Sequence, residues 1–163
     1  MERHYRRLYR IVLGYLRDPD DALDAVQEVF VKAFQHAARW DPASEVGAWL
    51  TRIAVNQAID SYRRARRRRA TMSPLDEGDR QASLEARDVS PERHTQGRQI
   101  AARIDSALRT LPERQRAVFV LRHYESMSLD EIAFALRMNL GTVKSSLHRA
   151  IRSLRDRLEG LHA

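Results

Sequence analysis

Apolar residues recur every three or four positions through most of the chain, which is the spacing of amphipathic α-helices. Alternating runs of β-branched and aromatic residues, which predict strands, do not occur in the sequence. The helical pattern breaks once, between about Thr71 and Arg98, where Ser, Pro, Gly and charged residues replace large apolar ones. We therefore predict an all-α protein in which a flexible linker, residues 71–97, joins two small helical domains, 1–70 and 98–163.

Two amphipathic helices separated by a loop are predicted in the N-terminal domain. The first helix begins after Pro19 and Asp20, and the loop covers Trp40 to Ser44. The second helix runs from Val46 into a cluster of arginines. The apolar face of the first helix is formed by Ala22, Ala25, Val26, Val29, Phe30, Ala33, Phe34 and Ala37.

The C-terminal domain ends in the pattern of a helix-turn-helix. Ser128 and Glu131 have the spacing of a capping box, so a short helix is predicted from there to about Leu136. After a brief turn a second helix opens at Gly141 and Thr142, and the pair has the dimensions of a helix-turn-helix. Two further helices meet at Pro112, and the first of them has the apolar stripe Ile100, Ile104, Ala107, Leu108 and Leu111.

The last helix has one apolar and one polar arc when its residues are placed at 100° intervals. The polar arc mixes hydroxyls with positive charge, as a helix needs for contacts with phosphates and base edges in a major groove. An ordinary helical hairpin with a polar surface is the alternative. The expected DNA contacts are Thr142, Lys144, Ser145, His148, Arg149 and Arg152, and the buried arc is Val143, Leu147, Ala150, Ile151, Leu154 and Leu158.

A second polar stripe lies on the helix that begins at Val46. It occupies a narrow arc opposite an apolar side and ends in arginines, so it can follow a nucleic-acid backbone while Asn56 hydrogen-bonds a base. Trp49 offers a surface for base stacking, with packing in the core as the alternative. The stripe consists of Arg52, Asn56, Asp60, Arg63 and Arg67, and Arg63, Arg64, Arg66, Arg67, Arg68 and Arg69 crowd its end.

The net charge makes nucleic acid the first candidate partner. Lysine and arginine number 29, against 22 aspartates and glutamates, and the formal net charge is +7. One surface departs from this balance, because an acidic face on the first helix would repel DNA. It is either inert surface or a dock for a protein partner. Its residues are Asp21, Asp24, Gln27 and Glu28.

Several classes of protein are excluded by what the sequence lacks. It has no cysteine, which excludes disulfides, thiolate zinc sites and cysteine nucleophiles and fits a cytoplasmic location. The six histidines have no metal-ligand spacing, there is no Gly-rich phosphate loop, and no serine has an evident base. Arginines interrupt the first 16 residues, so no signal peptide or membrane span is predicted there. We predict no enzymatic activity, no cofactor and no metal.

Two groups of motifs stand in order on either side of the expected linker. The first is Asp24-Ala25-Val26-Gln27-Glu28-Val29-Phe30, then Ala48-Trp49-Leu50-Thr51-Arg52-Ile53-Ala54-Val55-Asn56 and Asp60. The second is Leu111-Pro112-Glu113, Ser128-Leu129-Asp130-Glu131-Ile132-Ala133 and Gly141-Thr142-Val143-Lys144-Ser145. Together they resemble regions 2 and 4 of the extracytoplasmic-function (group 4) sigma factors of bacterial RNA polymerase.

This resemblance implies roles that residue spacing alone does not supply. The helix with Asp24, Gln27 and Glu28 would dock on the clamp helices of the polymerase β′ subunit, and the β subunit would also be contacted. The loop around Trp40 to Glu45 and the stripe with Asn56 would capture unstacked bases of the promoter −10 element. The helix from Gly141 would recognise the −35 element, and family habit implies an anti-sigma factor.

Two departures from the family and two alternative functions remain at this stage. Ser146 stands where family members often have an arginine, which affects −35 contacts. The chain also begins inside its first helix, without the short leader that is usual in the family. This leaves open a true start upstream of Met1. A helix-turn-helix repressor or activator, or an RNA-binding accessory protein, would share many of these features.

Overall fold

The computed structural model describes residues 2–71 and 91–159, with side chains from 4 and from 97, and every regular element in these ranges is helical. The predicted all-α class is confirmed, whereas most of the expected linker, at 72–90, lies outside the described residues. The elements are α1 (Glu2–Leu16), α2 (Pro19–Gln35), the short 3₁₀ turn η1 (Ala37–Arg39), α3 (Val46–Thr71), α4 (Pro91–Arg109), α5 (Glu113–His123), α6 (Leu129–Leu136) and α7 (Leu140–Glu159).

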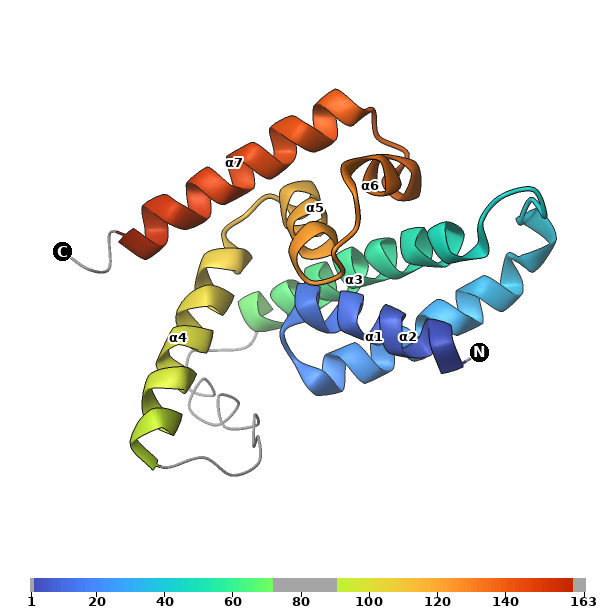
Figure 1. Cartoon of the computed structure of the whole chain (residues 1–163). Coiled ribbons are helices and arrows are strands. Elements are labelled where there is room, and N and C mark those ends of the chain that lie inside the picture. Colours follow the sequence, from blue (N-terminus) through green and yellow to red (C-terminus); the bar gives the residue numbers. More distant parts are fainter. Residues whose placement is uncertain (1, 72–90, 160–163) are drawn as a thin grey trace.

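The long helix α3 lies between two groups of helices (Figure 1). On one side it packs against α1 and α2, and on the other it meets α6. Helix α5 contacts α1, α6 and α7, while α4 packs against α7. The N-terminal half (α1–α3) and the C-terminal half (α4–α7) are therefore in direct contact.

Helix starts follow the capping residues. The Asp18 carboxylate accepts hydrogen bonds from the amides of Asp20 and Asp21, both at 3.0 Å, and Pro19 follows the cap. Helix α2 thus begins slightly earlier than the sequence predicts. Helix α4 begins at Pro91, inside the segment predicted as linker, because proline is well suited to the first helical position. The other predicted helix boundaries agree within one or two residues.

The hydrophobic core is continuous across the two halves. Leu8 and Val12 of α1 belong to the same buried cluster as Val118 and Leu121 of α5 and Ile132 of α6. A smaller cluster joins the predicted stripe of α4 to α7 through Ala107, Leu108, Leu111, Ala150 and Leu154. The predicted apolar stripe is not buried along its whole length, because Ile100, its first residue, is 57% exposed.

The predicted helix-turn-helix is present as α6 and α7. The capping box is confirmed: the Ser128 amide donates to Glu131 Oε2 at 2.6 Å, and the Glu131 amide donates to Ser128 Oγ at 3.1 Å. Arg137 ends α6 in the left-handed region with φ 52°. Asn139 Oδ1 then accepts from the Thr142 amide at 2.7 Å and satisfies one free donor at the start of α7.

We expect Ser128→Ala to lower the free energy of unfolding by about 1 kcal/mol, because it removes the cap of α6. Urea denaturation measures this. Ser153→Ala, within α7, is the matched control and should have no effect or stabilise slightly, since alanine favours helices. The hydrogen bond from the Ser128 amide also lowers the pKa of Glu131 from its usual 4.5. The stabilisation from the ionised Glu131 is therefore fully present at neutral pH, and it is lost as the pH falls below 4.5 and through the lowered pKa. Equal stability of both variants would contradict the capping assignment.

Candidate nucleic-acid interface

Helix α7 presents the six predicted DNA-contacting side chains on its exposed face. Val143, Ala150 and Leu154 on the opposite arc are buried, and Leu147, Ile151 and Leu158 are half-buried. The helix is thereby fixed with one face toward solvent. The exposed side chains are Thr142, Lys144, Ser145, His148, Arg149 and Arg152.

A shallow depression on α7 adds residues that sequence reasoning did not select. Ser153, Asp156 and Arg157 line it together with Arg149 and Arg152. Three guanidinium groups thus gather on one surface of a single helix, where they favour a polyanion such as a phosphate backbone. The arginine spacing was the signal that could have identified Arg157.

The polar stripe of α3 is on the surface, but its two ends differ. Asn56, Asp60 and Arg67 are exposed. Arg52 donates to two carbonyl oxygens of α6, to Ala135 O from Nε at 2.9 Å and to Phe134 O from Nη2 at 3.1 Å. Burial, and then the positive charge of Arg137, lower the pKa of Arg52.

Arg63, the other engaged member of the stripe, pairs with a carboxylate of the C-terminal half. Its Nε and Nη2 atoms donate to Glu113 Oε1 and Oε2 at 2.7 and 2.6 Å. This bidentate pair holds the pKa of Glu113 below its usual value. The stripe therefore has exposed members beside two arginines that already have partners.

Trp49 is half-buried and packs against the core. Its ring centroid lies 6.4 Å from that of Trp40, at an interplanar angle of 39°. The Trp40 Nε1 atom is buried and has no hydrogen-bond partner among the described residues. Packing thus accounts for much of the Trp49 surface, and the two rings order the start of α3 and the loop before it.

The acidic face of α2 lies beside the arginine cluster of α3. Asp24 and Gln27 are exposed, but Glu28 accepts from Arg64 Nη2 at 2.9 Å and also from the buried amide of Gln57. Burial, followed by the charge of Asp18, raises the pKa of Asp21. Carboxylates and guanidinium groups line one groove here, made of Asp21, Asp24, Ala25, Glu28, Ser61, Arg64, Arg67 and Arg68.

Other kinds of site find no support within 2–71 and 91–159. No three His, Cys, Asp or Glu side chains come together there in a way that would hold a metal ion. Across the same residues, no helix has both the length and the apolar character needed to cross a membrane.

Two protein families match the chain, one in each half. Residues 1–68 match Sigma-70 region 2, and residues 101–154 match Sigma-70, region 4.

Sigma factors from other bacteria match nearly the whole chain. The chain is 35% identical over 158 residues to the ECF RNA polymerase sigma factor SigE of Mycolicibacterium smegmatis, covering 97% of this chain and 60% of that protein. It is 37% identical over 155 residues to the RNA polymerase sigma-E factor of Streptomyces avermitilis, covering 93% of this chain and 79% of that protein. The chain thus spans less than two thirds of the first relative and more than two thirds of the second.

Two solved structures have a similar arrangement of helices. CnrH, in complex with the cytosolic domain of CnrY, has a TM-score of 0.69 and 26% identity, and the match covers 98% of this chain and 84% of CnrH. The sigma factor RpoE, in complex with the anti-sigma factor NepR from Bartonella quintana, has a TM-score of 0.63 and covers 96% of this chain and 92% of that one. At 23% identity, the second match shows the fold alone.

The contacts of the acidic face predict unequal effects on stability. Glu28→Ala should lower the free energy of unfolding by about 1–3 kcal/mol, because it removes an acceptor of the buried Gln57 amide. Asp24→Ala, the matched control on the same helix, should change it by less than about 0.5 kcal/mol because Asp24 is exposed. Chemical denaturation of the two variants measures the difference, and an equal change in both would contradict the predicted role of the Glu28–Gln57 contact.

Proposed function

The chain belongs to the extracytoplasmic-function sigma factors, and we propose that it binds core RNA polymerase and directs promoter-specific transcription initiation without being an enzyme itself. The match to region 2 and region 4, in order in one chain, carries this proposal. Residues 1–70 would act as region 2 and residues 98–163 as region 4. The site of action would be the cytoplasm, where promoter DNA and the polymerase meet.

Helix α7 would recognise the −35 element as duplex DNA. Its exposed face carries hydroxyl groups at Thr142 and Ser145 and cations at Lys144, Arg149 and Arg152. Hydroxyls and guanidinium groups hydrogen-bond both phosphate oxygens and base edges, which a helix in the major groove can reach. His148 lies on the same exposed face. Ser146 is half-buried, which favours these neighbours over Ser146 as the main DNA contacts.

The stripe of α3 and the loop before it would capture the −10 element as a single strand. Asn56 is exposed at the middle of the stripe, where its amide is free to donate to and accept from an unstacked base. Arg52, Arg63 and Arg67 would follow the backbone, beside Asp60. Trp49 and Trp40 would contribute ring surface next to the loop.

The exposed part of the acidic face would dock on the β′ clamp helices of the polymerase. Asp24 and Gln27 are accessible, and Asp21 is half-buried beside them. Glu28 is held by α3, so it would support the surface more than it contacts the partner. The β subunit of the polymerase would also be contacted.

An anti-sigma factor is the remaining partner that we propose. The CnrH structure contains the cytosolic domain of CnrY, and the RpoE structure contains an anti-sigma factor. Both match over nearly the whole of this chain, so the surfaces that such a partner would cover have counterparts here.

Run-off transcription with purified core polymerase and a genomic fragment library tests the function directly. Defined transcripts that appear only when the chain is added would support it and identify the promoter. Stable binding to duplex DNA without core polymerase, and no transcripts with it, would favour a conventional repressor or activator instead.

We expect Asp24→Arg to weaken binding to core polymerase by roughly tenfold or more, because it places positive charge on the docking face. Asp130→Arg, an equal charge change at an exposed residue of α6, is the control. Fluorescence anisotropy with labelled full-length chain measures both affinities, and circular dichroism should show unchanged helicity. Wild-type affinity of Asp24→Arg would refute the docking assignment.

The two DNA sites should fail in different ways. Arg149→Ala should lose about 1–3 kcal/mol of binding to the duplex −35 element, and pre-melting the −10 region should not rescue it. Asn56→Ala should bind the −35 element normally yet open the promoter poorly, and a pre-melted template should restore it in part. Permanganate footprinting compares both variants on closed and pre-melted promoters. Normal opening of a closed promoter by Asn56→Ala would assign the stripe to ordinary surface.

A further inference from the structure

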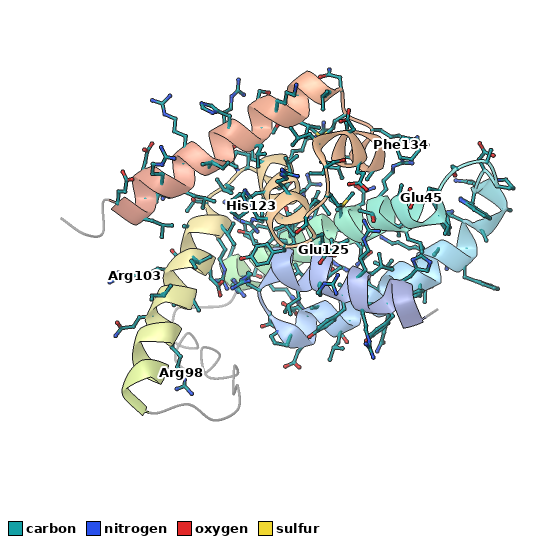
Figure 2. All side chains as sticks on the ribbon, viewed as in Figure 1. Glu45, Arg98, Arg103, His123, Glu125 and Phe134 are labelled. Carbon is teal, nitrogen blue, oxygen red and sulfur yellow. The ribbon has the colours of Figure 1, made fainter. Side chains whose placement is uncertain are left out.

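One carboxylate stands within the cationic face of α7. Asp156 lines the same shallow depression as Arg149, Arg152 and Arg157, and its side chain is exposed. At 100° per residue it falls between Arg149 and Arg152, on the arc opposite the buried Leu154. Figure 2 shows nitrogen-bearing side chains standing out from the side of α7 that lies away from α5. A negative charge therefore lies in the surface that would contact duplex DNA.

The stability of α7 does not account for Asp156. The last turn of a helix carries partial negative charge, so a carboxylate close to the final residue, Glu159, is unfavourable there. An arginine four positions before a carboxylate, as in Arg152 and Asp156, is also the weaker order for a helical ion pair. Within residues 2–71 and 91–159, none of the ion pairs includes Asp156.

The remaining charges of α7 favour binding to any duplex. The helix has five lysines and arginines against two acidic residues, in a chain of formal net charge +7. Non-specific affinity for DNA comes almost entirely from phosphate contacts, which carry no sequence information. Each cation that reaches a phosphate therefore strengthens binding to every sequence alike. A carboxylate on the same face opposes this part of the binding.

The length of α7 separates Asp156 from the side chains that would contact bases. The helix has 20 residues, or about 30 Å, whereas the major groove is about 12 Å wide. Thr142 and Ser145 are exposed near the N-terminal end, so this end would enter the groove. Asp156 follows Thr142 by about 21 Å along the axis and would then lie beyond the bases. A helix lying along the backbone would instead place its carboxylate against phosphates.

We propose that Asp156 is a specificity-determining residue, which weakens the binding of α7 to unrelated duplex DNA more than its binding to the −35 element. The −35 complex is held by base contacts as well as phosphates, whereas the non-specific complex has phosphates alone. Repulsion at Asp156 therefore raises the ratio of specific to non-specific affinity, which is the quantity that selects a site in a genome. This inference rests on the proposed function, which assigns duplex recognition to α7.

A positioning role for the same carboxylate predicts the opposite sign. If Asp156 held Arg152 toward a base, its loss would weaken the −35 complex and leave unrelated DNA nearly unaffected. The absence of an ion pair at Asp156 among the described residues favours repulsion over positioning. The direction of the change on the two kinds of DNA therefore separates the two roles.

Asp156→Asn tests the proposal, because it removes the charge at nearly constant size and shape. Asp20→Asn, at an exposed residue of α2 in the other half of the chain, makes the same change in net charge and is the control. Fluorescence anisotropy measures the binding of full-length chain to two labelled duplexes of equal length. One contains the −35 element of a promoter found by run-off transcription, and the other has the same bases in scrambled order. Circular dichroism should show unchanged helicity in both variants.

We expect Asp156→Asn to bind the scrambled duplex roughly threefold to tenfold more tightly, with a change of less than about twofold on the −35 duplex. On scrambled DNA the slope of log affinity against log salt should steepen by about 0.9, the value for one further phosphate contact. Asp20→Asn should match the wild type. Unchanged affinity for scrambled DNA, an equal gain on both duplexes, a loss on the −35 duplex or an equal gain by Asp20→Asn overturns the proposal. A wild type without preference for the −35 duplex would instead refute the proposed recognition by α7.

Discussion

The burial of the Arg116 guanidinium determines how the two halves of this protein meet. Removing a charged group from water costs several kcal/mol, and the cost must be offset where the group comes to rest. Tyr15 and Tyr62 cover its faces, and the Leu108 carbonyl accepts from Nε. Each cation–π contact contributes about 0.5–2 kcal/mol. Because these partners come from α1, α3 and α4, Arg116 is buried only when both halves are in place.

The two surfaces that we propose for promoter binding differ in how this arrangement affects them. The outward face of α7 is exposed, and its position depends on Val143, Ala150 and Leu154 packed beneath it. The stripe of α3 has two of its arginines bound to the C-terminal half. The contact between the halves therefore leaves the exposed face of α7 accessible, whereas it occupies two arginines of the α3 stripe.

Sequence reasoning was most successful where the determining interactions are local. The capping box of Ser128 and Glu131, the faces of α7 and the long helix from Val46 all depend on residues within a few positions of one another. It was weaker at helix starts, because Asp18 caps α2 and Pro91 opens α4 inside the expected linker. The contact between the halves was not predicted. Arg63 and Glu113, or Arg10 and Glu125, are far apart in sequence, and no periodicity relates them.

The central claim is that the two halves are packed together in the free chain around Arg116, and a distance distribution tests it most directly. Because the chain has no cysteine, Gln35→Cys on α2 and Asp156→Cys on α7 provide two exposed labelling sites. Pulsed electron spin resonance between spin labels at these positions should give one narrow distribution of distances in the free chain, because the two halves are packed around Arg116. A broad distribution of distances in the free chain would contradict the account.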